Sequence, residues 1–210
     1  MSLRMDMYSR KIILTIPKRI SESKALQFAL KHQDWINKQI QDLPEAVTFT
    51  HGASVPYLGQ KHKIIQDPNG KIRGLIKRQN NEIIVPGLPE HCPRRIEKFL
   101  KSEAKNIISE MARIKANKLG KTIKSFRFGD PKSRWGSCSS SGTLSFSWRL
   151  IMTPEHVVDY VVAHEVSHME HMNHSPQFWA LCEDMIETDI SVKTSKKWLR
   201  ENNKELQRYL

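Results

Sequence analysis

The stretch VVAHEVSHMEHMNHSPQFW, residues 161–179, contains four of the nine histidines of this 210-residue chain. The apolar run VVDYVV (residues 157–162) predicts a helix that carries His164 and His168. On such a helix the two side chains lie roughly 40° apart around the axis and about 6 Å apart along it. Both imidazoles can then reach one zinc ion at about 2.0–2.1 Å. Glu165 is offset from this pair and is better placed to contact a water molecule beside the ion.

Three residues compete for the third ligand position. His171 continues the same helix face, but three imidazoles along one straight helix match a tetrahedral ion poorly, so we place it outside the ligand set, near the site or at the surface. Glu170 points away from that face. His174 precedes Ser175-Pro176, a cap-and-proline signature that starts a new helix, so the chain can turn there and fold back over the ion. The predicted zinc ligands are therefore His164, His168 and His174.

A closed, structural zinc site would need a fourth protein ligand near this run, usually a cysteine. Cys182 is predicted to lie on the apolar face of the next helix, which favours a place in the core. A position would then remain open for water, whose pKa zinc lowers towards about 7. Glu165 would act as the general base that takes the proton of this water and returns it to a departing amine. The arrangement predicts hydrolysis of an amide bond.

Residues 143–151, TLSFSWRLI, alternate between apolar and polar side chains and predict a β-strand. If its edge is free, an extended substrate peptide could pair with it, with Ser145 and Ser147 as candidate binding residues; an interior strand is the equal alternative. Arg134, just before this strand, could orient a carboxylate or stabilise an oxyanion. Cys138 as a nucleophile paired with a histidine is a weaker alternative, because the histidines are better used as ligands.

The remaining patterns predict an α+β protein of two parts. Residues 1–90 are expected to form a small helix-plus-strands domain, and residues 91–210 are expected to form the domain that carries the histidines. The expected elements are a strand at 11–17, a helix capped by Ser21 that runs to 41, short strands within 46–86, a long helix at 93–119, and helices that begin at Thr153, at Ser175 and near 195.

The composition fits a cytoplasmic protein with a hydrophobic core: 39% of the residues are hydrophobic and 27% are charged. No apolar run approaches the roughly 20 residues that span a bilayer. The N-terminal segment MSLRMDMYSRKIILTIP lacks the apolar core of a signal peptide. The three cysteines are too few and too widely spaced for a disulfide framework, which favours a reducing compartment.

The charge of the chain is unevenly distributed. Residues 1–130 hold 25 Lys and Arg against 12 Asp and Glu, whereas residues 150–192 hold eight acidic residues and no Lys or Arg. A solvated surface is the simplest explanation of the basic part, and contact with nucleic acid through it is the alternative. The acidic part favours cations, including a metal ion and basic peptide segments, and argues against a nuclease at the histidines.

Two motifs also carry a resemblance. KSRWGSCSSSGTLSFSWRLI (residues 132–151) and HVVDYVVAHEVSHMEHMNHSPQFW (residues 156–179) resemble the YgjP-like group of predicted metal-dependent hydrolases, relatives of the SprT/Spartan and Wss-type zinc metallopeptidases. The resemblance implies a zincin-like catalytic domain with zinc on His164, His168 and His174 and with Glu165 as base. It also implies, more weakly, a DNA-linked role. Metzincins share the histidine spacing but place a glycine where His171 stands, and no Met-turn is evident here.

Three functions compete on these grounds. The leading one is a zinc metallopeptidase that acts on proteins or peptides. The second is a zinc hydrolase of a small amide or another non-peptide bond. The third is a non-enzymatic module that binds nucleic acid and holds a structural metal; the presence of Glu165 disfavours it, because a structural site has no use for a base.

Overall fold

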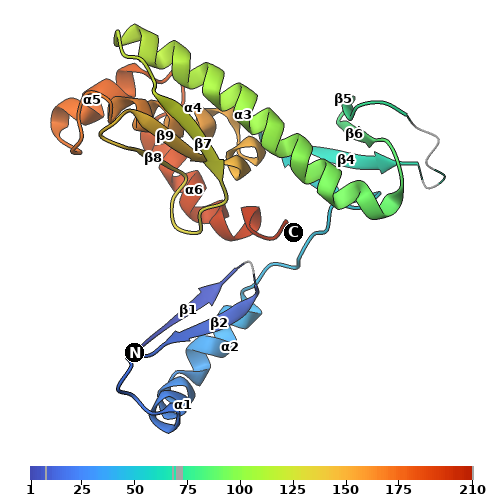
Figure 1. The fold of residues 1–210 in the computed structure, drawn as a ribbon, viewed down its shortest axis with the longest axis vertical. Helices are drawn as coiled ribbons and strands as arrows, with labels where there is room; N and C mark the ends of the chain where they lie inside the picture. Colours follow the sequence, from blue (N-terminus) through green and yellow to red (C-terminus); the bar gives the residue numbers. More distant parts are fainter. Residues whose placement is uncertain (8, 68, 70–72, 210) are drawn as a thin grey trace. The chain divides into compact units, whose positions relative to one another are not determined.

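The structure, a computed structural model, describes residues 1–7, 9–67, 69 and 73–209. It confirms the predicted α+β class, with mixed sheets and helices (Figure 1). The chain forms two compact units: residues 1–47 together with 203–210, and residues 48–202. Among the helices in the described ranges, none combines the length and the apolar character needed to cross a membrane.

The first unit contains a hairpin and two short helices. Strand β1 (Ser2–Asp6), which the sequence did not predict, pairs antiparallel with β2 (Lys11–Thr15). Helices α1 (Glu22–Lys31) and α2 (Gln33–Gln41) follow, and the Ser21 hydroxyl caps α1 by accepting from the Lys24 N–H. The single helix predicted up to residue 41 is wrong. His32 leaves the helical conformation (φ −109°, ψ 22°), and its Nδ1 donates to the Phe28 carbonyl at 2.8 Å, which caps the end of α1.

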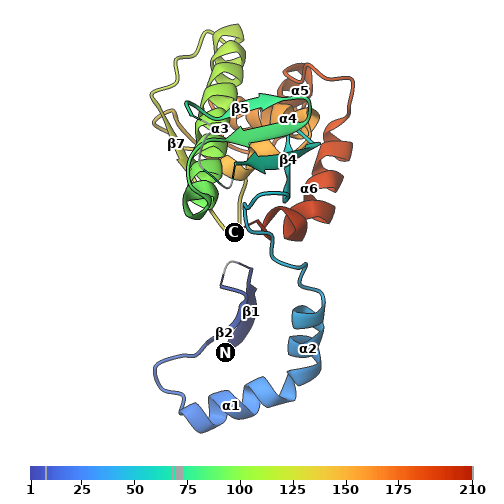
Figure 2. The same cartoon turned by 90° about the vertical axis from the view of Figure 1, so that its right-hand side faces the viewer.

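The second unit begins with a four-stranded sheet in the order β3-β4-β6-β5. Strands β4 and β6 are parallel, whereas the β3–β4 and β5–β6 pairs are antiparallel. Figures 1 and 2 show this sheet beside the N-terminal half of helix α3 (Cys92–Lys118). The strand bounds are β3 (Ser54–Tyr57), β4 (Gln60–Gln66), β5 (Lys77–Gln79) and β6 (Glu82–Val85). Residues 68 and 70–72 of the predicted strand region lie outside the described residues.

This sheet packs on helix α3 and on the segment around Ile151. The Tyr57 ring stacks on Phe99 with centroids 6.3 Å apart, and its hydroxyl donates to Glu103 at 2.6 Å. The Leu58 N–H donates to the Ile151 carbonyl at 2.7 Å. The chain therefore divides after residue 47 and not after residue 90 as predicted, because aromatic packing and main-chain hydrogen bonds join residues 48–90 to the following elements.

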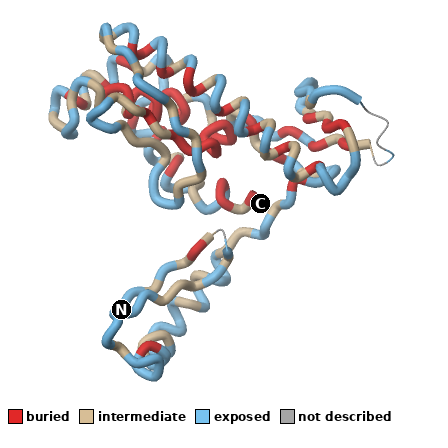
Figure 3. The backbone as a smooth tube through the Cα atoms, viewed as in Figure 1, coloured by how far each residue is buried: buried red, intermediate tan, exposed pale blue. Residues whose placement is uncertain are grey.

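After the short helix η1 (Pro89–His91), helix α3 (Cys92–Lys118) runs through the second unit as predicted, and Gly120 follows its end with φ +63°. Its buried face follows a spacing of four residues and continues through Ala112 and Ala116, whereas Ile114 is 45% exposed. The buried residues of this helix and of α4 form the centre of the core in Figure 3.

A three-stranded sheet with the order β7-β9-β8 lies next to α3 and α4. Strand β7 (Ser125–Gly129) is parallel to β9 (Thr143–Ser147), and β8 (Gly136–Cys138) is antiparallel to it. The strand predicted for residues 143–151 is too long. The Ser147 hydroxyl accepts from the Arg149 N–H at 3.3 Å and caps the 3₁₀ helix η2 (Trp148–Met152), so the chain turns into the core.

Three helices complete the second unit: α4 (Glu155–Ser167), α5 (Pro176–Asp184) and α6 (Val192–Leu206), whose last residues belong to the first unit. Ser175 caps α5 as predicted, since its hydroxyl accepts from the Phe178 N–H. Thr153 does not cap α4, because its hydroxyl donates to the Leu150 carbonyl at 2.8 Å; the helix starts after Pro154. Helix α6 begins three residues earlier than predicted.

Candidate metal centre

Helix α4 presents the first two histidines at its C-terminal end. Its preceding turns are buried valines and alanine, which fix the helix in the core. His164 lies in the last turn and His168 is the C-cap, with φ −65° and ψ −16°. Their ring centroids are 4.9 Å apart and the ring planes are nearly perpendicular, at 88°. The i, i+4 spacing therefore brings both imidazoles to one place, as the sequence predicts.

The chain then turns and brings a third imidazole back. After α4 the N–H of His171 bonds to the Ser167 carbonyl, and the helix does not continue. The Ser175 cap starts α5 in a new direction and places His174 over the end of α4. The Nε2 atoms of His174 and His164 are 3.2 Å apart. Within the described residues, His164, His168 and His174 are the one group of three side chains whose possible ligand atoms converge, all within 4.8 Å of one another.

These three residues fit a zinc ion. Ligand nitrogens about 2.05 Å from a tetrahedral ion are about 3.4 Å apart, close to the 3.2 Å between His164 and His174. Nδ1 of His168 donates to the His171 carbonyl at 3.0 Å, which leaves its Nε2 as the lone-pair donor. Burial, with the neighbouring His168, His174 and Lys196, lowers the pKa of His164 to about 4, so this imidazole is neutral near pH 7, the form that binds metal.

His171 takes part through its main chain. Its carbonyl orients His168, and its ring is not a member of the converging group. The structure thus places the His171 ring outside the cluster and gives its backbone an orienting role, which the sequence did not reveal.

Aromatic side chains of α5 hold the imidazoles in place. Phe178 lies against His168 with centroids 4.5 Å apart, and the Trp179 ring stacks on His174 at 5.4 Å and 20°. Lys196 of α6 lies over the Trp179 ring, with Nζ 3.5 Å from the ring centroid, a cation–π contact. Lys196 is 17 residues further along the chain than Trp179, so only the fold shows that it joins this group.

Glu165 lies beside the histidines in a buried position. Glu165 is only 6% exposed, and this burial raises the pKa of its carboxyl group to about 7. The positive charge of Arg134 acts to lower this pKa. Strand β8 forms the wall next to it: a Cβ at Gly136 would lie 2.6 Å from Cγ and Oε1 of Glu165. The glycine of the RWGSC motif therefore leaves room for the carboxylate, a role that the sequence alone did not indicate.

Gly136→Ala should therefore displace the Glu165 side chain. We expect the fold and the zinc content to persist, because the three atoms nearest to the added methyl group all belong to Glu165 and none to a histidine. The rate of substrate cleavage should fall by about 10- to 100-fold, since about 1 Å of misplacement can cost that much. Gly129→Ala is the matched control for the fold and the zinc content, because a Cβ added there in the same sheet meets no described atom within 4 Å. Unchanged cleavage by Gly136→Ala would show that Glu165 is free to move without loss.

The other predicted site residues have different outcomes. Strand β9 pairs on both sides, with β7 and with β8, so of the two alternatives for this strand the structure shows the interior strand and not the free edge. Ser147 is 1% exposed and caps η2, which leaves no surface for a substrate. Arg134 is exposed and near enough to Glu165 to affect its pKa, and Ser145 lines a pocket on the sheet. Their contact with a substrate stays a prediction.

The cysteines do not join the chemistry. Burial, assisted by the charge of Glu165, raises the pKa of the Cys138 thiol to about 11, so it is protonated at neutral pH and is a poor nucleophile. Cys182 is fully buried in the core, as predicted, and is not part of the converging group.

The chain matches the family model "YgjP-like, metallopeptidase domain" over residues 1–202. It therefore belongs to the YgjP-like metallopeptidase family, a family of metal-dependent peptidases, which confirms the resemblance seen in the two motifs. A search of curated protein sequences gives no match. Among solved structures, the metallopeptidase zymogen abylysin of Pyrococcus abyssi is 20% identical, with 49% of this chain and 98% of that chain covered and a TM-score of 0.38. A TM-score this low does not establish a common fold.

Proposed function

We propose that this chain is a zinc-dependent peptidase of zincin-like design, in which His164, His168 and His174 hold one zinc ion and Glu165 is the general base. The observation that carries the proposal is the convergence of three imidazole donors beside a buried carboxylate. Three protein ligands are typical of catalytic zinc sites, which keep a position open, whereas structural sites are closed by a fourth ligand. Family membership supports a metal-dependent peptidase at the coarser level.

A zinc ion bound there would supply Lewis acidity, which would polarise a carbonyl group and lower the pKa of a water molecule, so that the water can lose a proton and attack near pH 7. Glu165 would take the proton of the attacking water on its carboxylate and deliver it to the amine nitrogen that leaves. A base with a pKa near the working pH is suited to both transfers, and burial raises the pKa of Glu165 to about 7. Phe178 and Trp179 pack against the imidazoles and restrict their rotation.

Removal of metal tests this function. The full chain should cleave a fluorescently labelled unfolded protein, and a chelator such as 1,10-phenanthroline should reduce cleavage to background, because activation of the water depends on the ion. Added zinc should restore the rate. Cleavage that persists in the chelator would contradict the proposal, and turnover of small acyl amides without any cleavage of unfolded protein would replace the peptidase with a hydrolase of small amides.

A further inference from the structure

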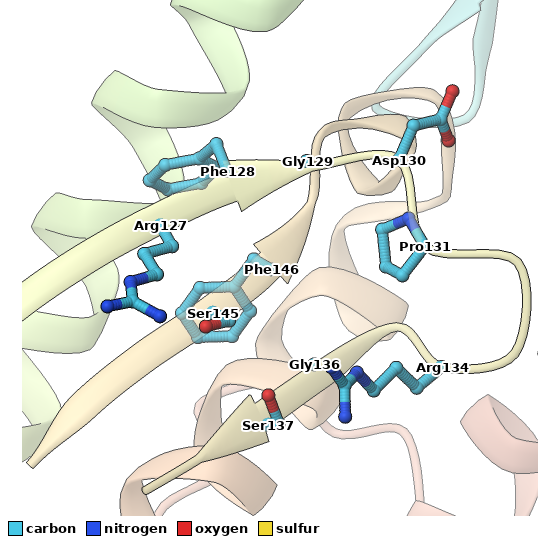
Figure 4. A pocket seen from close by; sticks show the side chains of 10 residues that line it. All are labelled: Arg127, Phe128, Gly129, Asp130, Pro131, Arg134, Gly136, Ser137, Ser145 and Phe146. Carbon is cyan, nitrogen blue, oxygen red and sulfur yellow. The ribbon is translucent and has the colours of Figure 1, made fainter.

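A pocket of about 320 Å³ lies on the β7-β9-β8 sheet (Figure 4). This volume is at the small end of ligand pockets, about 300–1,000 Å³. The strand register places Arg127 opposite Ser145 and Ser145 opposite Ser137, so one row across the sheet presents a guanidinium and two hydroxyl groups. Arg134 contributes a second guanidinium from the segment that leads into β8.

The pocket carries an excess of positive charge. Its one acidic lining residue, Asp130, is engaged by Arg149, whose Nε lies 2.9 Å from Oδ1. Arg127 and Arg134 have no ion-pair partner in the part of the chain that the structure describes, and both side chains are exposed. Two guanidinium groups and two hydroxyl groups are donors that suit an oxyanion, and guanidinium geometry matches a carboxylate in particular.

Strand β8 lies between the pocket and the position of the base. Gly136 lines the pocket and also faces the Glu165 carboxylate, so one backbone segment separates the two. Arg134 lines it and acts electrostatically on Glu165. Within the described residues no strand pairs with the outer edge of β8, so a peptide that passes this edge could hold a carboxylate in the pocket and extend towards Glu165.

We propose that this pocket is a carboxylate subsite and that the preferred substrates are peptides that place an acidic side chain or their C-terminal carboxylate in it. The inference rests on the proposed peptidase function. Nucleic acid is disfavoured as the occupant, because its binding requires several phosphate contacts along an extended basic surface. Residues 150–192, which include the histidine cluster, have eight acidic residues and no Lys or Arg, and would repel such a polyanion.

Binding of four labelled peptides to the zinc-loaded, full-length Glu165→Gln chain tests the subsite without turnover. The peptides share one sequence and differ in Glu or Gln at the internal acidic positions and in a free or amidated C-terminus. At low ionic strength, fluorescence anisotropy should show about tenfold tighter binding where the recognised carboxylate is present. Arg127→Gln and Arg134→Gln should each remove most of this preference. Lys124→Gln, the same charge change at an exposed residue outside the pocket, should retain it.

The pattern of the preference identifies its source. Dependence on the terminus alone assigns the C-terminal carboxylate, and dependence on Glu alone assigns a side chain; either supports the subsite. The carboxylate subsite would be overturned if all four peptides bind equally, or if the preference survives in both arginine variants. It would also be overturned if single-stranded oligothymidylate binds in an arginine-dependent way while the peptides are not discriminated. Cleavage by the wild-type chain without discrimination would refute the subsite alone, whereas discrimination without any cleavage would refute the peptidase function alone.

Discussion

Glu165→Gln should abolish peptide cleavage while one zinc ion per chain stays bound. Gln keeps the size of Glu and one accepting oxygen, but it cannot accept the proton of the attacking water at neutral pH. General base catalysis contributes about 10²- to 10⁴-fold, so the rate should fall by at least that range. The zinc content should be unchanged because the ligand atoms belong to the three histidines. Cleavage rates on an unfolded protein and elemental analysis of the same preparation measure both effects.

Glu170→Gln is the matched control for Glu165→Gln. Glu170 follows five residues later, is exposed and pairs with Lys121 at 2.9 Å on the surface. The loss of this exposed pair should leave cleavage unchanged. Cleavage by Glu165→Gln at the wild-type rate would show that another group takes the proton.

Lys115→Met should strongly destabilise the second unit. The Lys115 side chain is completely buried, and its Nζ lies 2.6 Å from Oδ1 of Asp159, which is also buried. The ammonium group also donates to the Met185 carbonyl at the end of α5, so it ties α3 to both α4 and α5. Its removal leaves the Asp159 carboxylate buried without its cation, which typically costs about 3–5 kcal/mol. We expect a matching decrease in the free energy of unfolding, measured by urea denaturation.

Two further variants test the cause of that loss. Lys118 lies three residues after Lys115 on the same helix and forms an exposed ion pair with Glu187. Lys118→Met removes this pair and should change stability little. Lys115→Met combined with Asp159→Asn removes both charges but keeps an oxygen for the N–H groups of Glu187 and Thr188, so it should recover part of the lost stability. A single Lys115→Met variant as stable as the wild type would contradict the assigned role of this pair.

Local patterns in the sequence predicted the elements that build the candidate centre. The valine run and the i, i+4 histidines define the end of α4, and the Ser175-Pro176 signature defines the start of α5. Together they require a corner between the helices, and a corner brings His174 back to His164. These inferences succeeded because each depends on residues a few positions apart, where helical geometry and capping decide the structure.

Features that depend on contacts far apart in the sequence were not predictable in this way. The alternation of residues 143–151 continues past Ser147, yet η2 follows there, and its Arg149 side chain pairs with Asp130, 19 residues earlier in the chain. Nothing near Gly136 indicates that Glu165 will approach it, since the two are 29 residues apart. The division of the chain at residue 47 likewise depends on Tyr57 packing against α3.

The zinc content of purified His174→Ala, compared with that of His171→Ala, tests the central claim most directly. The ring of His174 lies 3.2 Å from that of His164, whereas His171 contributes a carbonyl that alanine retains. Elemental analysis should find about one zinc ion per chain in the wild type and in His171→Ala and close to none in His174→Ala, because three ligands are the usual minimum of such sites. Loss of zinc from His171→Ala with retention in His174→Ala would contradict the proposed ligand set.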